Sequence, residues 1–323
     1  MNILVSVFGD PVWTLPYEEV DRLKTIFPQH RFVDARDPDA LASALPEADV
    51  ALTTRIDRNL LPLAVHLRWI QSPAAGVGLM MNDRMRESPV VLTNARGLHV
   101  DPIAEHAIGV TIALARHLHV AIRNQAQGNW AKPAMASFTT LRGRRMGVVG
   151  FGAIGSAIAS RAACLGMAIS ALTRSGRPVS APGVDRAYSC TQLPELLAES
   201  DVVVICAPST PETSGLIGRR ELRLMKPTAF LVNVSRGRLV REAELAEELA
   251  AGTIAGAALD VFEREPLDVR SPLWQLPNVI VTPHTSAFSP EYWTAAVDLF
   301  AENLRRFEAG RPLLNVVDKV AGY

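Results

Sequence analysis

The residue spacing that points most directly to chemistry is a glycine-rich run, Gly-Phe-Gly-Ala-Ile-Gly, at positions 150–155. It lies between an apolar run at 145–149 and a helical pattern, a context typical of dinucleotide-binding sites. Gly150 allows the tight turn, Gly152 lets the backbone approach a pyrophosphate, and Gly155 lets the helix pack closely on the strand. The helix N-terminus offers N–H groups to the phosphates. The predicted cofactor contacts in this motif are Gly150, Gly152, Ala153, Ile154 and Gly155.

The next predicted strand, residues 168–172, ends without a carboxylate. An acidic side chain about 20 residues after the motif would bind the ribose hydroxyls of NAD and repel a 2′-phosphate. Here the strand leads into Thr173, Arg174 and Ser175. Arg174 can pair with phosphate oxygens and Ser175 can donate a hydrogen bond. The sequence therefore predicts a preference for NADP, with NAD as a possible second cofactor.

Three further polar segments follow predicted strands. They are Asn-Val-Ser-Arg-Gly at 233–237, Asp-Val-Phe-Glu-Arg-Glu-Pro-Leu at 260–267 and Thr-Pro-His-Thr-Ser at 282–286. In an open α/β sheet, ligands bind outside the carboxyl ends of the strands. We therefore expect these three loops to converge on the nicotinamide ring.

The elements that position these loops follow an α/β pattern, because short β-branched runs alternate with helical patterns along most of the chain. Predicted strands cover residues 2–8, 50–52, 69–71, 90–93, 145–149, 168–172, 202–206, 230–233, 257–260 and 279–281. Predicted helices cover residues 101–121, 154–165, 242–250 and 290–307. The helix at 101–121 is apolar on nearly every face, so we expect it to be buried between domains or subunits.

Length and charge limit the class of protein. The chain has 323 residues, enough for two domains at roughly 150 residues each. Its 33 basic and 33 acidic side chains balance, so the phosphate neutralisation that drives nucleic-acid binding is not expected. Apolar runs are too short to cross a membrane. The three cysteines lack metal-ligand spacing and their odd number disfavours a disulfide framework, so we expect no metal site and a cytoplasmic location.

Taken together, the glycine motif and the three strand-end segments resemble the D-isomer-specific 2-hydroxyacid dehydrogenase family in order and spacing, from about residue 66 to residue 317. The resemblance implies a Rossmann-type, doubly wound parallel-sheet coenzyme domain inserted into a second, smaller, flavodoxin-like α/β substrate domain. It places the substrate domain at residues 1–98 and 289–323 and the dinucleotide-binding domain at 99–288. It also implies a homodimer, with the helix 101–121 at the domain or dimer interface.

The family's catalytic arginine, glutamate and histidine fall on Arg236, Glu265 and His284. Reduction of a 2-keto acid needs a cation for the carboxylate and keto oxygen, and a proton for the developing alkoxide. The permanently charged Arg236 would supply the first and His284 the second. Glu265 would favour the protonated imidazole and orient it. Glu263 is expected to be a solvated loop carboxylate and His106 to be structural.

The resemblance also carries over binding residues. The segment 71–78 resembles the family's substrate loop, in which main-chain N–H groups hold the substrate carboxylate. The predicted substrate contacts are Ala75, Gly76, Val77, Arg236 and His284. The turn at 206–208 resembles the family's cofactor-lining turn, and Asp260 resembles the residue that contacts the nicotinamide carboxamide. This adds Cys206, Ala207, Pro208 and Asp260 to the predicted cofactor contacts.

The resulting prediction is an NADPH-preferring reductase that transfers a hydride to a small 2-keto acid such as glyoxylate, hydroxypyruvate or pyruvate. Two alternatives stay open. One is a nucleotide-sensing, corepressor-like binding protein on the same fold, and the other is an enzyme that oxidises hydroxy acids with NAD. Turnover of a 2-keto acid by micromolar protein discriminates the enzyme from the sensor.

Overall fold

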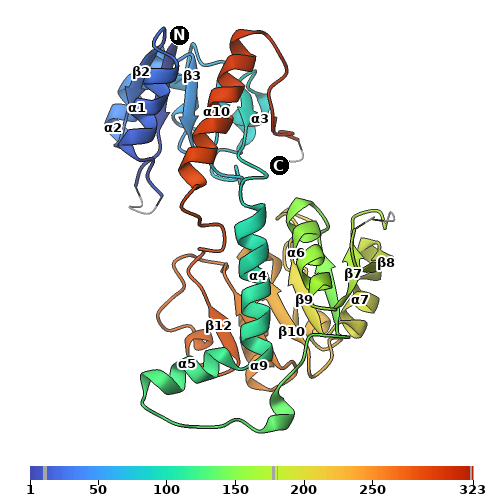
Figure 1. The fold of residues 1–323 in the computed structure, drawn as a ribbon. Helices are drawn as coiled ribbons and strands as arrows, with labels where there is room; N and C mark the ends of the chain where they lie inside the picture. The colour runs from blue at the N-terminus through green and yellow to red at the C-terminus, as the bar shows by residue number, and fades with distance from the viewer. Residues whose placement is uncertain (10–12, 177–178, 180, 321, 323) are drawn as a thin grey trace. The chain divides into compact units, whose positions relative to one another are not determined.

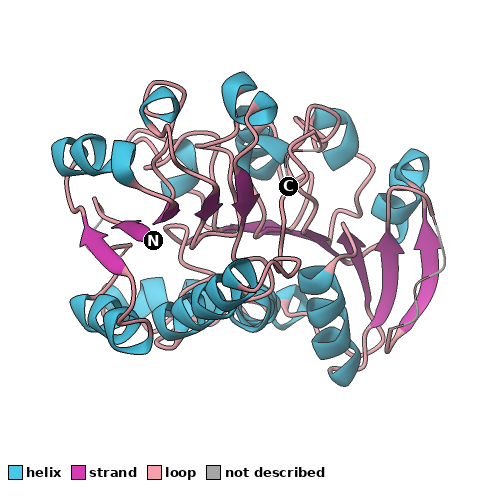
Figure 2. Cartoon of the chain, turned by 90° about the horizontal axis from the view of Figure 1, so that it is seen from above, coloured by secondary structure: helices cyan, strands magenta, loops and turns pink. Residues whose placement is uncertain are grey.

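The computed structural model describes residues 1–9, 13–176, 179, 181–320 and 322, and the chain divides into two compact units (Figure 1). Unit 1 comprises Met1–His99 and Ser289–Tyr323, and unit 2 comprises Val100–Phe288. Each unit contains a parallel sheet of its own, with helices on both faces of the strands (Figure 2). This arrangement confirms the predicted α/β fold class.

In unit 1 the strands lie in the order β2-β1-β3-β4-β5, the order of flavodoxin-like sheets. Their bounds are β1 Asn2–Ser6, β2 Arg31–Asp34, β3 Val50–Thr53, β4 Trp69–Gln71 and β5 Val91–Thr93. The helices are α1 Tyr17–Ile26, α2 Pro38–Ala44, α3 Asp83–Glu87 and α10 Tyr292–Glu308, with 3₁₀ turns at Leu45–Glu47 and Leu61–Leu63. The last helix, α10, completes the core of this unit, because Phe300 stacks on the buried Trp69 at 5.2 Å between ring centroids.

In unit 2 the strands lie in the order β12-β11-β10-β9-β6-β7-β8. Their bounds are β6 Arg145–Val149, β7 Ala168–Leu172, β8 Val184–Tyr188, β9 Val202–Ile205, β10 Phe230–Asn233, β11 Gly256–Leu259 and β12 Val279–Val281. The helices are α4 Val100–Ala115, α5 Leu118–Ala126, α6 Ala153–Cys164, α7 Leu193–Glu199, α8 Arg219–Leu222 and α9 Glu242–Ala250, with 3₁₀ turns at Met135–Ser137, Cys190–Gln192, Gly237–Leu239 and Pro272–Trp274. Chain order reverses between the neighbouring strands β6 and β9. The carboxyl ends of these two strands are therefore the topological switch point of a doubly wound sheet.

Burial explains which strands the sequence reveals. Every residue of β9 and β10 is buried, as expected for central strands covered on both faces. By contrast, β2 and β8 were not predicted from the sequence. Neither strand contains a buried residue, so polar residues are admitted along it and the apolar run is lost. The other two edge strands, β5 and β12, keep buried positions and apolar runs.

The predicted single helix at 101–121 is wrong, because the structure divides it into α4 and α5. His117, between them, has a left-handed backbone with φ of 52°. The chain returning after α5 holds this break: Thr139 N–H donates to the carbonyl of Ala115, and a ring nitrogen of His117 lies 2.9 Å from the Ser137 carbonyl oxygen. These tertiary contacts override the continuous helical pattern. No helix among the described residues is long and apolar enough to span a membrane.

Some strand ends also differ from the prediction by one or two residues. β1 ends at Ser6, β9 at Ile205 and β11 at Leu259. The consequence is functional, because Cys206 and Asp260 lie in the loops that follow their strands.

Candidate active site

The glycine loop after β6 is packed on two sides and open on the third. Gly150 has a φ of 93°, and a Cβ placed there would lie 2.5 Å from the Ala207 nitrogen. A Cβ on Gly155 would lie 2.4 Å from the carbonyl oxygen of Gly150. A Cβ placed on Gly152, at the N-cap of α6, would meet no atom of the described residues within 4 Å. The loop is therefore locked against β9 and its own helix, while the position where a pyrophosphate would approach is free of side chains.

The turn after β9 lies directly against this loop, as the contact between Gly150 and Ala207 shows. Its Ala207 carbonyl also accepts a hydrogen bond from the Ser235 hydroxyl, which joins the turn to the loop after β10. Burial raises the pKa of the Cys206 thiol to about 12, so the thiol stays protonated and unreactive. The structure thus brings together the predicted Cys206–Pro208 turn and the glycine loop.

The loop after β7 presents a different surface. Arg174 and Ser175 are exposed. The Arg174 guanidinium makes no hydrogen bond or ion pair with another residue in the described part of the chain. Hydrogen bonding lowers the pKa of the Glu212 carboxylate, and the charge of Arg174 adds to that shift. Thr173 shapes the turn, since its hydroxyl accepts the Gly176 N–H at 3.0 Å. The guanidinium of Arg174 is therefore available to an anion at the end of this strand.

Arg236 follows β10 in a loop held by its neighbours. The buried Asn233 side chain accepts the Ser235 N–H at 3.1 Å and donates to the Arg236 carbonyl at 3.1 Å. Desolvation lowers the pKa of the Arg236 guanidinium, and the charge of Glu265 opposes that shift. An arginine nevertheless stays protonated in proteins. The residue remains exposed, so its fork can reach a ligand.

Glu265 and His284 form a closely paired acid and base in the site. His284 Nδ1 lies 2.6 Å from Glu265 Oε2, and the other oxygen of this carboxylate accepts the Phe262 N–H at 3.0 Å. An ionised carboxylate can only accept, so Nδ1 carries the proton of the neutral imidazole and Nε2 is left for a ligand. His284 has a left-handed φ of 55°, a strained backbone that the surrounding contacts must maintain.

Those contacts come from Asp260, which is buried with 1% of its surface exposed. Its carboxylate accepts the Thr282 hydroxyl at 2.6 Å and the N–H groups of Thr285 and Ser286 at 3.0 Å each. The Asp260 carbonyl accepts the N–H of His284 at 2.9 Å. The loop that carries His284 is therefore folded around a single buried carboxylate.

Glu263 is an exposed loop residue, as the sequence suggested, but its carboxylate also has a hydrogen-bonding partner. Its carboxylate accepts the N–H of Glu242 at 3.0 Å, and the Glu242 carboxylate accepts the N–H of Glu263 at 3.1 Å. The pair ties the loop that bears Glu265 to the first turn of α9. Burial raises the pKa of Glu242, and the charge of Glu263 adds to the shift. Sequence spacing gave no signal for this contact, which joins residues 21 positions apart.

The predicted substrate loop lies in unit 1, after β4. Three successive carbonyls are anchored: Pro73 accepts from the Tyr292 hydroxyl, Ala74 from the Ala95 N–H at 3.1 Å, and Ala75 from the Asn94 amide at 2.8 Å. Because N–H and C=O point in opposite directions across a trans peptide, the N–H groups of Ala75 and Gly76 face away from these anchors. Neither they nor the Val77 N–H donate to any described residue.

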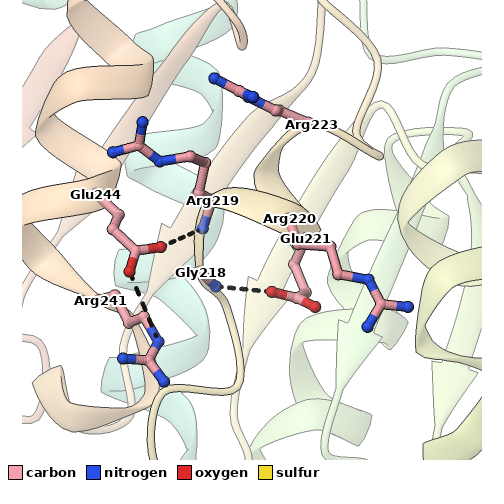
Figure 3. Close-up of a pocket in the computed structure, with 7 residues that line it drawn as sticks. All are labelled: Gly218, Arg219, Arg220, Glu221, Arg223, Arg241 and Glu244. Atoms are coloured by element: carbon pink, nitrogen blue, oxygen red, sulfur yellow. Dashed lines mark hydrogen bonds and ion pairs between the residues drawn. The ribbon is translucent and has the colours of Figure 1, made fainter.

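An open hollow of about 490 Å³ lies elsewhere in unit 2, at the start of α8 and α9 (Figure 3). It is lined by Gly218, Arg219, Arg220, Glu221, Arg223, Arg241 and Glu244. Three of its arginines have acidic partners: Arg219 pairs with Glu247, Arg223 with Glu248 at 2.9 Å and Arg241 with Glu244 at 3.9 Å. None of the predicted site residues lines this hollow, so we do not assign the chemistry to it.

Comparison with known proteins decides the family. The model of the D-isomer specific 2-hydroxyacid dehydrogenase NAD-binding domain matches residues 108–286, more than half of the chain. The chain belongs to this family. It is 35% identical over 290 residues to a glyoxylate reductase of Thermococcus litoralis, covering 88% of this chain and 85% of that protein.

Two solved structures agree along nearly the full length. A family member from Xanthobacter autotrophicus in complex with NADPH has a TM-score of 0.83 and 32% identity, with 99% of each chain covered. An NADPH-dependent glyoxylate/hydroxypyruvate reductase from Sinorhizobium meliloti, in complex with NADP, has a TM-score of 0.83 and 28% identity, with 100% of each chain covered.

As a D-2-hydroxyacid dehydrogenase, the protein is an NAD(P)-dependent oxidoreductase. The range matched by the family model includes the glycine motif and the three strand-end loops, whereas the substrate loop at 71–78 lies outside it. The roles of the individual residues are argued below.

Proposed function

We propose that this dehydrogenase is an NADPH-preferring reductase of small 2-keto acids such as glyoxylate, hydroxypyruvate or pyruvate, with Arg236, Glu265 and His284 as its catalytic residues. The observation that carries the proposal is the 2.6 Å contact between His284 Nδ1 and Glu265 Oε2. It fixes the imidazole so that the opposite nitrogen, Nε2, faces a ligand as the proton donor.

The groups present fit the reaction. When bound, the reduced nicotinamide supplies the hydride to the keto carbon. The carbonyl electron pair moves to oxygen, and His284 Nε2 gives that oxygen its proton. Arg236 binds the carboxylate and keto oxygen of the substrate and stabilises the developing negative charge. Glu265 keeps the imidazolium charged and oriented, and in the oxidative direction His284 takes the proton back.

The cofactor assignment rests on the open position at Gly152 and on the loop after β7. A dinucleotide fits because Gly152 leaves room for a pyrophosphate at the N-terminus of a twelve-residue helix, α6. Exposed Arg174 and Ser175 would hold a 2′-phosphate, where a carboxylate would repel it. The relatives from Xanthobacter and Sinorhizobium bind NADPH or NADP, which supports the same preference here.

Ala75, Gly76 and Val77 are proposed to bind the substrate carboxylate. Because the carbonyls of this loop accept hydrogen bonds from Asn94 and Ala95, the adjacent N–H groups face away from those partners. Successive N–H groups of this kind form an anion-binding concavity. Asp260, which was predicted to contact the nicotinamide carboxamide, already accepts three hydrogen bonds through its carboxylate. These bonds, together with the bond from the His284 N–H to the Asp260 carbonyl, hold the His284 loop.

A homodimer is the proposed assembly. Large apolar side chains are exposed on α5 and on the segment after it: Leu118 by 46%, Ile122 by 64%, Trp130 by 91% and Met135 by 91%. Apolar surface of this extent is typical of an interface. Sedimentation velocity should show a dimer that Ile122→Asp dissociates, whereas Val269→Asp, at another site with 90% exposure, should leave it intact. A monomeric wild-type protein at micromolar concentration would contradict the proposal.

The test of function is the loss of reduced-nicotinamide absorbance with purified protein. NADPH and NADH are assayed in parallel against glyoxylate, hydroxypyruvate, pyruvate and a bulky branched 2-keto acid. The proposal predicts turnover that prefers NADPH and the smaller acids. Tight binding of NADPH without turnover of any acid would support the nucleotide-sensing alternative, and faster turnover with NADH would refute the Arg174 assignment.

A further inference from the structure

A chain of hydrogen bonds runs from α4 to the loop that carries His284. His106, in the second turn of α4, lies with Nε2 3.2 Å from the Thr282 hydroxyl oxygen. That hydroxyl donates to Asp260 Oδ1 at 2.6 Å. His106 and Thr282 are 176 positions apart in the sequence, and both are half-buried. Neither residue has a place in the reaction described above.

The chemistry of the three groups fixes the direction of every proton. The ionised Asp260 carboxylate can only accept, so Thr282 must direct its single hydroxyl proton towards it. The Thr282 oxygen is then left as an acceptor, and His106 must donate to it through an N–H on Nε2. Burial lowers the pKa of His106, with the charge of Asp260 opposing that shift, which favours the neutral ring. The neutral His106 tautomer with its proton on Nε2 therefore fits both hydrogen bonds.

This chain of hydrogen bonds ends at the Asp260 carboxylate, around which the His284 loop folds. Asp260 accepts the N–H groups of Thr285 and Ser286 through the same carboxylate, and the N–H of His284 through its carbonyl. His284 keeps its left-handed φ of 55° between these bonds. A donor that orients Asp260 from the side of α4 therefore also fixes the backbone from which the His284 imidazole projects.

We infer that His106 and Thr282 are positioning residues for His284, which act through the buried Asp260 carboxylate. The inference rests on the proposed function of His284. A helix in the core of unit 2 is thereby coupled to the loop that transfers the proton. Displacement of a catalytic group by about 1 Å costs roughly 100-fold in rate, so a small relaxation of this loop has a measurable effect.

The first test compares isosteric and conservative substitutions in the full-length protein. Thr282→Val removes the hydroxyl without changing the shape, and should lower kcat for keto-acid reduction about 10- to 100-fold. The dissociation constant for NADPH, measured by fluorescence titration, should stay within twofold of wild type. Thr282→Ser restores the hydroxyl and should recover most of kcat. The matched control is Thr111→Val, a buried threonine of α4 whose hydroxyl, among the residues that the structure describes, bonds only to the carbonyl of Ala107 in its own helix.

The second test addresses His106 and adds a readout, the tautomer of the ring, that does not depend on turnover. His106→Gln places an amide N–H the same number of bonds from Cβ and should retain kcat, whereas His106→Leu should lose it as Thr282→Val does. Long-range ¹H–¹⁵N spectra of the histidine-labelled protein should show His106 protonated on Nε2. A proton on Nδ1, or a wild-type kcat in Thr282→Val and His106→Leu, would overturn the inference. An inactive wild-type protein with the Nε2 tautomer intact would instead refute the proposed function.

Discussion

Two loops of unit 2 follow parallel strands of the same sheet, yet they are built in opposite ways. The loop after β12 is folded around the buried Asp260 carboxylate, and its catalytic candidate, His284, is held in a strained backbone. The loop after β7 exposes Arg174 and Ser175, and Arg174 has no hydrogen-bonding partner among the described residues. In the proposed function the difference separates two tasks: the reaction requires the fixed geometry of the His284 loop, and cofactor choice uses the exposed charge of Arg174, which can be changed without unfolding the site.

The largest effect should come from His284 itself. His284→Gln keeps a polar side chain of similar size but cannot deliver a proton. We expect kcat for reduction to fall about 1,000-fold, within the range for removal of a general acid. Nucleotide affinity should change little, because the glycine loop is untouched. Steady-state kinetics with a parallel NADPH titration measure both, and a variant with more than a tenth of the wild-type kcat would argue against the assignment.

A smaller loss is expected at Glu265, which orients the imidazole but exchanges no proton with the substrate. Glu265→Gln can still accept the Nδ1 proton, yet it no longer favours the charged imidazolium. We expect kcat to fall about 10- to 100-fold, as for other carboxylates that orient a functional histidine. Steady-state kinetics measure this loss, and a wild-type kcat in Glu265→Gln would show that the 2.6 Å contact is not used in the reaction.

The exposed loop should respond only through the cofactor. Arg174→Ala removes a charge-assisted bond to the 2′-phosphate, so KM for NADPH should rise roughly tenfold or more while KM for NADH stays constant. Arg311→Ala, an exposed arginine of unit 1, is the control. Equal changes in both constants would remove Arg174 from the phosphate site.

The smallest effect concerns stability. Burial raises the pKa of Glu242, so the folded state binds this proton more tightly than the unfolded chain does, and stability is lost as pH rises through the folded value. Glu242→Gln removes that loss and keeps an oxygen that can accept the Glu263 N–H. The free energy of unfolding at neutral pH should rise by less than about 1 kcal/mol and the difference should vanish in acid. Urea titrations at two pH values measure it, and a clear destabilisation at neutral pH would contradict the expectation.

Sequence reasoning reached the parts of the molecule that depend on local pattern. Buried runs such as β9 and β10 and the Gly150–Gly155 spacing carry their structure within a few residues. The edge strands β2 and β8 lack such a run, and the break at His117 is set by contacts with Ser137 and Thr139 that no helical pattern contains.

The same limit applies to the site. Arg236, Glu265 and His284 were assigned catalytic roles through family resemblance, since each lies in a short motif after a strand, and these roles stay predictions. Two contacts join distant segments of the sequence. One is the pair of reciprocal hydrogen bonds between Glu242 and Glu263, and the other is the bond from His106 to Thr282. Nothing in either segment alone predicts such a contact, because its geometry exists only once the sheet has formed.

The measurement that tests the central claim most directly is the pH dependence of the chemical step in both directions. Under single-turnover conditions, with NADPH and glyoxylate for reduction and NADP with glycolate for oxidation, His284 must be protonated for the first reaction and neutral for the second. The account predicts that the reduction rate falls and the oxidation rate rises as pH increases. A flat profile in both directions, under conditions where chemistry limits the rate, would contradict His284 as the proton donor.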